Sequence, residues 1–434
     1  MKRLFYYLFA ALCAGTLAGC SDEPSATEGE QNKTEQAEPV VFEEQGEISY
    51  ISSLQLNENE EKVVAGNNAF AWNYFAKTCE NAGDKNVVMS PLAVSIAMTM
   101  LANGAYENSP VRAEILNLLG YGDCNIKDVN SCAMKLADGI NRLDKNVSLS
   151  VANSLWVKNY TTTLSPEYIS LLKNEFVAES YPINSSSFVN DVNKWCALRT
   201  DGMIDNLLSA NSPAPDVAII NATYFKGAWS EDYVFSEGLN TTGNFKNANG
   251  TYSNAEYMNQ VMVYKTRNND MMEAAEIPFG DGNYAFYMLK PGDGYSVKDC
   301  CEALSDGKWN DFMKLQSHNS YLELKLPKFE VDFASNVKDL LSEMGMTHAM
   351  NDLDYKFACK DGLKVESVMQ KTTFRVTEDG AEAAAVEDIN WWSGSAGEGE
   401  SPTPRAFHLD RPFIYLIAEK NTGTIIFMGC LNKI

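Results

Sequence analysis

Residues 377–405 read TEDGAEAAAVEDINWWSGSAGEGESPTPR and separate two stretches with strong strand character. A segment of this length without its own secondary structure is unusual inside a compact domain and is usually functional or disordered. If residues 380–386 formed a strand, Ala381, Ala383 and Ala385 would share one face. Small side chains on one face suit a strand that enters late between two neighbours that are already packed. Helix propensity favours a short Ala-rich helix instead, so composition leaves both alternatives open.

Around this segment, the hydrophobic pattern predicts helices first and strands later. Apolar residues recur with helical spacing over 60–78, and a second helix should run from Ser90 to about residue 103, with Ser90 as its cap and Pro91 in its first turn. Runs rich in β-formers predict strands at 149–157, 217–225, 284–289, 321–326 and 413–418. Because helices and strands do not alternate regularly, the pattern indicates an α+β fold with large antiparallel sheets.

The charge and motif content argue against several function classes. The chain has 434 residues, 45% of them hydrophobic, and its 58 acidic against 35 basic residues give a net charge of −23. This charge disfavours nucleic acid as a partner and direct binding to an anionic membrane. Only three histidines are present, and there is no GxSxG, HExxH, P-loop or dinucleotide motif, so we expect no enzyme, no metal and no cofactor. Carboxylate pairs are too abundant to single out a glycosidase dyad.

The first 47 residues predict an export signal and a tether. Residues 1–19 combine a positive start with an apolar run over 4–17 that is too short to cross a bilayer, as in a signal peptide. Residues 17–20, LAGC, resemble the lipobox of bacterial lipoproteins, which implies cleavage before Cys20 and lipidation of that residue. A plain signal peptide with an incidental Cys20 is the alternative. The rest of 20–47 is acidic and nearly free of large apolar side chains, which predicts a disordered tether.

The tether also suggests a location. Residues 21–23, SDE, resemble the signal that sends lipoproteins of Bacteroidetes-type bacteria to the cell surface, although an ordinary linker start has the same composition. We therefore expect an outer-membrane lipoprotein, at the cell surface or on the periplasmic side, that touches the membrane only through its lipid. Eight cysteines remain in the body of the protein, most of them in apolar patterns, and Cys124 and Cys132 could pair across a loop.

Several motifs in the correct order resemble the serpin family over about residues 67–434. They are NVVMSP at 86–91 with LANGA at 101–105, NATYFKGAW at 221–229, LPKF at 326–329, LSEMGM at 341–346, FHLDRPF at 407–413 and FMG at 427–429. The stretch EDGAEAAA at 378–385 is similar to the hinge of inhibitory members. The resemblance implies a single domain over 48–434, with about nine helices around three mostly antiparallel sheets. It also implies an exposed reactive loop over about 378–405.

In function, the resemblance implies an inhibitor of serine endopeptidases, with cysteine endopeptidases as further targets, that works as a monomer. A protease attacks the loop as bait and forms an acyl-enzyme. The cut loop then inserts into the main sheet as a new strand and distorts the protease before it can deacylate. The uncleaved fold must therefore be kinetically trapped above its lowest state.

The resemblance also assigns roles to individual residues. The hinge comprises Glu378, Gly380, Ala381, Ala383, Ala384 and Ala385, with the odd-numbered alanines facing inward after insertion. The shutter, which holds the sheet closed, comprises Ser90, Asn221 and Gln370. The breach, where insertion begins, comprises Trp229, Lys328 and Glu378; a surface ion pair that contributes little is the alternative reading of its two charged residues.

Four positions depart from the family pattern. Gln370 stands where the shutter usually has His, Ala93 replaces a second shutter Ser, and Met203 replaces a Lys. The fourth, Glu387, has the same inward-facing parity as Ala381. Burial of an unpaired carboxylate costs several kcal/mol or forces its protonation, so Glu387 needs a partner or insertion should stall there.

Spacing from the hinge predicts the scissile bond and the target class. Family inhibitors are cut about seventeen residues from the hinge Glu, which gives Gly394–Ser395. Residues within the error of this count are Trp392, Ser393 and Ala396. Small residues at this bond predict elastase-like, subtilisin-like or papain-like targets. Trp391 and Trp392 would instead suit a chymotrypsin-like enzyme, and Arg405 lies too far along for a trypsin-like one.

Two other functions remain open at this point. A non-inhibitory serpin that binds or carries a ligand is favoured by Glu387 and disfavoured by the Gly-Ala hinge. A surface lipoprotein that captures glycans is supported only by the tether and the Trp residues.

Overall fold

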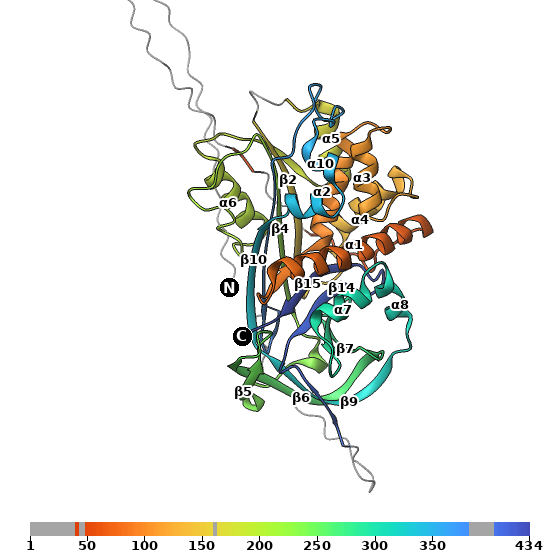
Figure 1. Ribbon diagram of the computed structural model, residues 1–434, viewed down its shortest axis with the longest axis vertical. Coiled ribbons are helices and arrows are strands. Elements are labelled where there is room, and N and C mark those ends of the chain that lie inside the picture. Colours follow the sequence, from red (N-terminus) through yellow and green to blue (C-terminus); the bar gives the residue numbers. More distant parts are fainter. Residues whose placement is uncertain (1–39, 43–47, 159–162, 382–402) are drawn as a thin grey trace, which may run out of the picture. The chain divides into compact units, whose positions relative to one another are not determined.

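The computed structural model describes residues 40–42, 48–158, 163–381 and 403–434. Both predicted helices are confirmed. Helix α1 (Glu58–Ala82) begins at a capping box in which the Asn57 side chain accepts from the Glu60 backbone and Glu60 accepts from Asn57. Helix α2 (Pro91–Gly104) begins at Ser90, whose side chain accepts from the Ala93 backbone, and every residue of α2 is buried. The largely apolar sequence thus makes α2 a fully buried helix, which lies beside the long strands in Figure 1.

Eight further α-helices lie in the described ranges, which makes ten against the expected nine or so. They are α3 (Pro110–Leu118), α4 (Ile126–Gly139), α5 (Pro166–Phe176), α6 (Phe188–Arg199), α7 (Val297–Leu304), α8 (Lys308–Lys314), α9 (Lys338–Glu343) and α10 (Thr347–Asn351). Two short 3₁₀ turns, η1 (Glu231–Tyr233) and η2 (Glu237–Leu239), follow strand β4. Helices α2, α3, α4, α5 and α10 gather on one side of the long strands in Figure 1, and α6 lies on the other side.

A six-stranded sheet carries the elements that matter for function. Its order is β10 (Phe329–Asn336), β11 (Ser367–Val376), β4 (Val217–Ala228), β2 (Val147–Val157) and β3 (Glu179–Pro182), and the two-residue strand β12 (Gly380–Ala381) pairs with β4. The central strands β4 and β11 are parallel, whereas β10–β11 and β2–β4 are antiparallel. Because β4 and β11 run in the same direction, a strand inserted between them can pair antiparallel with both.

A nine-stranded sheet forms the second layer. Its strands, in order, are β1 (Val87–Met89), β15 (Ile425–Leu431), β14 (Phe413–Glu419), β8 (Tyr284–Pro291), β7 (Met272–Phe279), β6 (Tyr252–Asn268), β9 (His318–Pro327) and β13 (Arg405–His408), with β5 (Thr241–Lys246) paired to β6. All five strands that the sequence predicted are confirmed. Strands β14 and β15 are buried at every position.

The expected number of sheets needs a correction, because the strands of the described residues form two hydrogen-bonded sheets and not three. The reason is the length of β6. Its start pairs with β5, its middle with β9 and its end with β7, so one continuous strand joins what would otherwise be two sheets. The α+β class with mostly antiparallel pairing is confirmed.

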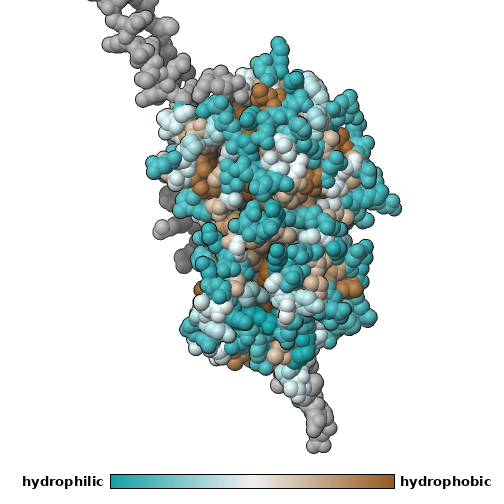
Figure 2. Space-filling model, in the orientation of Figure 1, coloured by the Kyte–Doolittle hydropathy of each residue, from teal (hydrophilic) through white to brown (hydrophobic). Residues whose placement is uncertain are grey.

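Two hydrophobic clusters fill the space around the six-stranded sheet. The larger one lies between that sheet, α1, α2 and the nine-stranded sheet. The smaller one joins α6 to the other face of β4 through Trp156, Trp195 and Ile220. Phe42 packs against Tyr181 at the border of this smaller cluster, with ring centroids 5.3 Å apart. The surface in Figure 2 is mainly hydrophilic with small scattered hydrophobic areas. Among the described helices, none is both long and apolar enough to cross a membrane.

Candidate functional site

The start of the Ala-rich segment is already part of the six-stranded sheet. Gly380 pairs with Ala228 of β4, Ala381 pairs with Gly227, and both are buried. Gly380 has φ +142°, and a Cβ at this position would come within 2.1 Å of the Gly227 carbonyl oxygen. Only glycine tolerates that conformation and that contact. Of the two alternatives left open by composition, the described part of the segment is a strand.

The turn before β12 directs the chain back onto the sheet. Thr377 and Gly380 form an isolated antiparallel bridge, with the Thr377 N–H donating to the Gly380 carbonyl at 2.9 Å. The chain thus leaves β11, reverses, and enters beside β4 as an antiparallel strand. The predicted hinge residues Ala383, Ala384 and Ala385, together with Glu387, Trp391 and Trp392, the bond Gly394–Ser395, Ser393 and Ala396, fall outside the described residues.

Pairing between β4 and β11 stops well before these strands end. Their parallel register covers 218–223 of β4 and 367–372 of β11, whereas β4 continues to Ala228 and β11 to Val376. The two strands therefore separate at the end where β12 enters. The sheet is closed along one half of this boundary and open along the other, and the open half is occupied first by Gly380 and Ala381.

The three breach residues lie around the open end. Lys328 Nζ lies 3.0 Å from Glu378 Oε1 and 3.3 Å from Glu256 Oε1. Trp229 donates from its indole nitrogen to the Thr377 carbonyl at 3.0 Å, and its ring stacks on Phe279 with centroids 4.7 Å apart. The side chain of Glu378 is only 7% exposed, so the Lys328–Glu378 pair is not a fully solvated surface ion pair.

The surroundings of Glu378 favour its charged form. Burial alone would raise the pKa of this carboxyl, but hydrogen bonds from Asn240 and Lys328 outweigh burial and hold that pKa below its usual value. The same carboxylate contributes to raising the pKa of the Lys328 ammonium. The backbone carbonyl of Glu378 also accepts from the Phe235 N–H at 3.3 Å, so this residue is fixed to the loop that follows β4.

The shutter residues Asn221 and Gln370 lie about halfway along the same sheet, Ser90 caps α2 beside them, and all three are fully buried. Ser90 donates from its hydroxyl to the Ile426 carbonyl at 2.8 Å, which ties the start of α2 to β15. Gln370 donates from Nε2 to the Ser90 carbonyl at 2.9 Å and accepts from the Tyr74 hydroxyl at 3.3 Å. An amide that donates and accepts at once can therefore occupy the position where the family usually has His.

Asn221 completes the shutter and forms a row of polar residues across the sheet. In register, Asn153 of β2 faces Asn221 of β4, and Asn221 faces Gln370 of β11. Asn221 donates from Nδ2 to Asn153 Oδ1 and, at 3.5 Å, to the Ala93 carbonyl. At the position of the missing second Ser, Ala93 thus contributes its backbone only.

Several polar atoms in this part of the sheet have no partner among the described residues. They are Asn153 Nδ2, Asn221 Oδ1, Thr223 Oγ1 and Thr372 Oγ1, all on the β2, β4 and β11 strands. A buried polar group without a hydrogen bond costs free energy, typically about 1–3 kcal/mol. The closed sheet therefore carries a local energetic penalty at the place where it would have to open.

The other family departure lies at the end of α6. Met203 donates its backbone N–H to the Thr200 carbonyl at 2.9 Å, and Gly202 has φ +81°. Thr200 stabilises this turn by donating to the Cys196 carbonyl and accepting from the Ile204 N–H. The turn is thus held by Thr200 and Gly202, and no contact of the Met203 side chain is needed for it.

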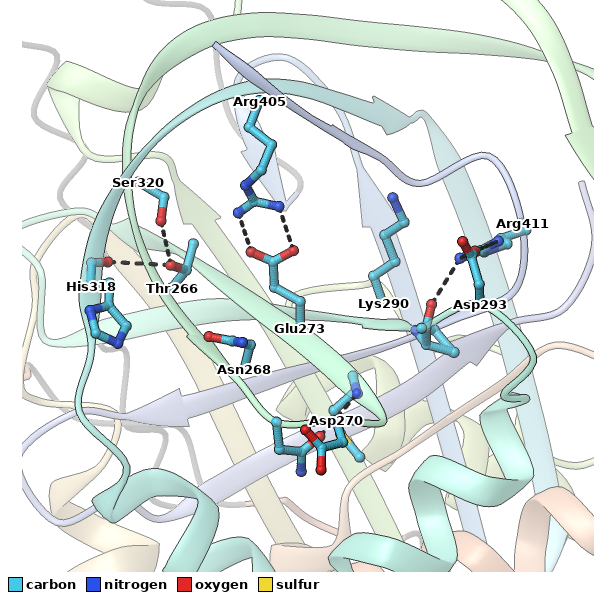
Figure 3. A pocket seen from close by; sticks show the side chains of 14 residues that line it. Thr266, Asn268, Asp270, Glu273, Lys290, Asp293, His318, Ser320, Arg405 and Arg411 are labelled. Carbon is cyan, nitrogen blue, oxygen red and sulfur yellow. Dashed lines mark hydrogen bonds and ion pairs between the residues drawn. The ribbon is translucent and has the colours of Figure 1, made fainter. Parts of the chain in front are cut away.

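At the other end of the segment, Arg405 is the first residue of β13. It lines a polar pocket of about 620 Å³ together with residues from β6, β7, β8 and β9 (Figure 3). Its guanidinium binds the Glu273 carboxylate through two hydrogen bonds, and this pairing raises the pKa of Arg405. Because Arg405 pairs in register with Leu322 and binds Glu273, it is part of the scaffold.

The thiols and carboxylates of the described residues form neither a disulfide nor a metal site. The eight cysteines of the described residues are all free, so the suggested Cys124–Cys132 pair is absent: Cys132 lies in the core and donates to the Glu60 carbonyl, whereas Cys124 is half-buried. Within the described part of the chain, no group of three or more His, Cys, Asp or Glu side chains could hold a metal ion.

Sequence reasoning missed four residues of this site. Asn153, Tyr74, Asn240 and Glu256 hold Asn221, Gln370, Glu378 and Lys328 respectively. Asn153 gave a signal, since it is the one polar residue on a face of β2 that is otherwise made of Val and Leu. Asn240 and Glu256 gave none, because they contact Glu378 and Lys328 only through the fold, across 138 and 72 positions of the chain.

The chain was compared with known protein families and with curated proteins. A family model described as Serpin (serine protease inhibitor) matches residues 65–434. A serpin-like protein of Methanosarcina mazei is 27% identical over 378 residues, which cover 85% of this chain and 86% of that protein. Iripin-5 of Ixodes ricinus is 27% identical over 394 residues, covering 87% and 95%.

Solved structures of serpins share the fold of this chain. The native state of the thermophilic serpin tengpin aligns with a TM-score of 0.75 and 24% identity over 89% of this chain and 98% of that one. Human thyroxine-binding globulin with thyroxine aligns with a TM-score of 0.78 and 22% identity over 86% and 99%. At these identities the likeness concerns the fold alone.

Proposed function

The chain belongs to the serpin family, and we propose that it is an irreversible suicide-substrate inhibitor of serine endopeptidases. In this proposal a protease cleaves the reactive loop and forms an acyl-enzyme. The freed loop then inserts between β4 and β11 before hydrolysis is complete. Loop insertion is a recognised form of strand addition in serpins.

The observation that carries the proposal is the pairing of Gly380 and Ala381 with β4 at the open end of the sheet. These two residues define a register and a direction for the rest of the loop. The breach contacts of Glu378 and Trp229 hold the turn in place, and beyond Thr223 and Thr372 the strands β4 and β11 no longer pair with each other. Insertion would extend a strand that has already begun.

The register also accounts for the inward-facing Glu387. If insertion continues the Ala381–Gly227 pairing, Glu387 comes to lie opposite Asn221 of β4. If it continues the Thr377–Gly380 bridge, the same residue comes to lie opposite Gln370 of β11. Both registers therefore place Glu387 between two amide side chains that already face each other. Amide N–H groups are suitable donors to a carboxylate, and Asn153 Nδ2, next to Asn221, has no partner among the described residues.

The length of β4 fits the predicted cleavage site. In the same register, residues 380–391 would cover β4 from Ala228 to Val217, which is the whole strand. Gly394–Ser395 then falls just beyond the end of the sheet, where an acylated protease would not obstruct the inserted strand. Gly380 and Ala381 already pair, so ten of these positions are new, and at about 0.5–1.5 kcal/mol net per hydrogen bond they would supply a driving force of about 5–15 kcal/mol.

One incubation tests this proposal. The purified protein is mixed with an elastase-like or a subtilisin-like protease, because small residues flank the predicted scissile bond, and the products are run on a denaturing gel. We expect a covalent complex that survives boiling in SDS, and mass spectrometry of the released peptide should place the cut within two residues of Gly394. Cleavage of the loop with full recovery of protease activity would show that the loop is only a substrate.

A second candidate function is a non-inhibitory serpin that binds a ligand, and Glu387 is the feature that favours it. If no donor reaches this carboxylate, its burial would stop insertion. Glu387→Ala separates the two cases. If Asn221 and Gln370 hold the carboxylate, the variant lowers the resistance of the cleaved form to guanidinium and leaves the intact form unchanged. If the carboxylate is unpartnered, the variant forms more of the covalent complex than the wild type.

We further propose that lipidation of Cys20 anchors the inhibitor to the outer membrane. This rests on the lipobox-like residues 17–20 and on the acidic composition of 21–47. Expressed in a bacterium that processes lipoproteins, the wild type should enter the detergent phase on Triton X-114 partition, and Cys20→Ser should enter the aqueous phase. Equal partition of the two proteins would exclude the anchor. Digestion of the protein on intact cells by added protease would indicate the cell surface, and protection from that protease would indicate the periplasmic side.

A further inference from the structure

Three thiols from distant parts of the chain meet outside the site described above. Cys79 lies near the end of α1, Cys301 in α7 and Cys430 in β15. The sulfur atoms of Cys79 and Cys430 are 3.6 Å apart. Hydrogen bonds with Cys301 and Cys430, together with burial, raise the pKa of the Cys79 thiol well above its usual value. Elsewhere in the described chain, no two cysteine sulfurs are hydrogen-bonded to each other.

The cluster is accessible from one side. Cys301 and Cys430 are fully buried, but Cys79 is only half-buried. Cys79 and Cys301 line a pocket of about 970 Å³ that α1 and α7 form with the loops around Pro291 and Arg411. Asn432 also lines this pocket and donates from its amide to Cys430 Sγ at 3.4 Å. A small molecule in the pocket would thus reach Cys79 first, with Cys430 directly behind it.

We propose that Cys79 and Cys430 are an oxidisable pair that a small disulfide converts into a cystine cross-link. The Cys79 thiolate attacks one sulfur of the external disulfide, breaks its S–S bond and releases one thiol, which leaves a mixed disulfide on Cys79. The Cys430 thiolate then attacks the Cys79 sulfur and releases the second thiol. The two cysteines lose two protons and two electrons, and the external disulfide gains them as two thiols.

The cross-link would stabilise the part of the fold that does not change in the inhibitory reaction. It joins residues 351 positions apart and ties α1 to the interior of the nine-stranded sheet, where Cys430 pairs with Val87 and Ile414. Closing so long a loop restricts the unfolded chain strongly. Neither cysteine lies on β4, β11 or β12, so loop insertion should continue in the oxidised protein.

The test is mild oxidation of the full chain. The reduced protein is incubated for hours with hydroxyethyl disulfide at pH 8.5. An alkaline pH is needed because exchange proceeds through the thiolate and the raised pKa of Cys79 disfavours loss of the thiol proton. We expect a mass lower by two hydrogen atoms, a Cys79–Cys430 peptide after digestion, and a rise in the unfolding temperature of about 5 °C.

Variants and controls complete this test. Cys79→Ser should abolish the mass change, while Cys196→Ser, which removes a buried thiol in the cluster under α6, should leave it intact. The unfolding temperature of each variant in reductant verifies its fold. The mass change of the oxidised wild type tests the proposal even if a variant fails to fold. A permanent adduct of the reagent, an unchanged mass, or a Cys79–Cys301 cross-link would overturn the proposal.

Discussion

The two sheets of this protein use buried positions in opposite ways. In the nine-stranded sheet, β14 and β15 are buried throughout, carry almost only apolar side chains and pair on both sides. In the six-stranded sheet, the central strands β4 and β11 carry Asn221, Thr223, Gln370 and Thr372 inside the protein. Three of these four residues have a side-chain atom without a partner among the described residues.

The difference indicates which sheet can open. Separating β14 from β15 would expose apolar surface that no incoming strand would cover. Separating β4 from β11 would break only six parallel register positions, 218–223 against 367–372, and would bring a new strand to polar groups that lack partners. In the proposed mechanism the nine-stranded sheet, here called the support sheet, stays unchanged, and the six-stranded sheet, here called the receptor sheet, takes up the reactive loop.

The largest expected effect comes from blocking insertion of the loop into the receptor sheet. Ala383→Arg would place a long charged side chain on the inward face, opposite Phe225 in the register set by Ala381, so insertion should stop and the inhibitor should become a substrate. The covalent complex on a denaturing gel should disappear while cleavage continues. Ala384→Arg, on the opposite face, is the matched control and should retain most of the complex. Equal loss in both variants would contradict the assigned parity.

In the support sheet, truncation should cost stability without changing the mechanism. Leu416 of β14 is fully buried, and Leu416→Ala should lower the free energy of unfolding by about 2–5 kcal/mol because it leaves a cavity in the core. Denaturant unfolding measures this loss. The fraction of protease trapped per cleaved inhibitor should stay as in the wild type. A changed fraction would mean that the nine-stranded sheet also takes part in insertion.

A smaller effect of opposite sign is expected in the receptor sheet. Thr223→Val replaces a buried hydroxyl that has no partner in the described chain with a methyl group of the same shape. The intact protein should become more stable by about 1 kcal/mol, and formation of the covalent complex should slow, because the closed sheet loses part of its penalty. Denaturant unfolding and the rate of complex formation measure the two effects. Destabilisation of the intact form would show that Thr223 has a partner, such as an ordered water.

The smallest effect concerns the breach and depends on pH. Because the folded-state pKa of Glu378 lies below its usual value, its charged form contributes stability above the unfolded-state pKa. That stability should be lost as the pH falls through the folded-state pKa. Glu378→Gln should remove this dependence. Unfolding temperatures of wild type and variant should therefore differ near neutral pH and converge in acid, and parallel curves would contradict the role of the Lys328–Glu378 pair.

Sequence reasoning reached most of the fold because its signals were local. Ser90 and Pro91 mark the start of α2, and the apolar runs at 217–225 and 413–418 mark β4 and β14. The number of sheets has no such local signal in the sequence. It depends on β6 continuing through seventeen residues across three partners, which no turn residue or period reveals.

For the site, the sequence predicted the hinge, shutter and breach residues better than the residues that contact them. Gly380 was expected for its backbone freedom, and the structure adds a stricter reason, since a side chain would collide with the Gly227 carbonyl. Gln370 and Glu387 were separate departures from the family pattern in the sequence alone. The register of β12 is needed to see that an inserted Glu387 would meet Gln370 and Asn221, because that relation depends on a turn between Thr377 and Gly380.

The central claim is that the intact protein is trapped above a lower state that the cut loop reaches by entering the β4–β11 boundary. Thermal unfolding of intact protein and of protein nicked within the loop tests this most directly. About ten new ladder hydrogen bonds predict a rise in melting temperature of at least about 10 °C after the cut. Identical melting temperatures, with the cut segment still fully sensitive to further proteolysis, would contradict the account.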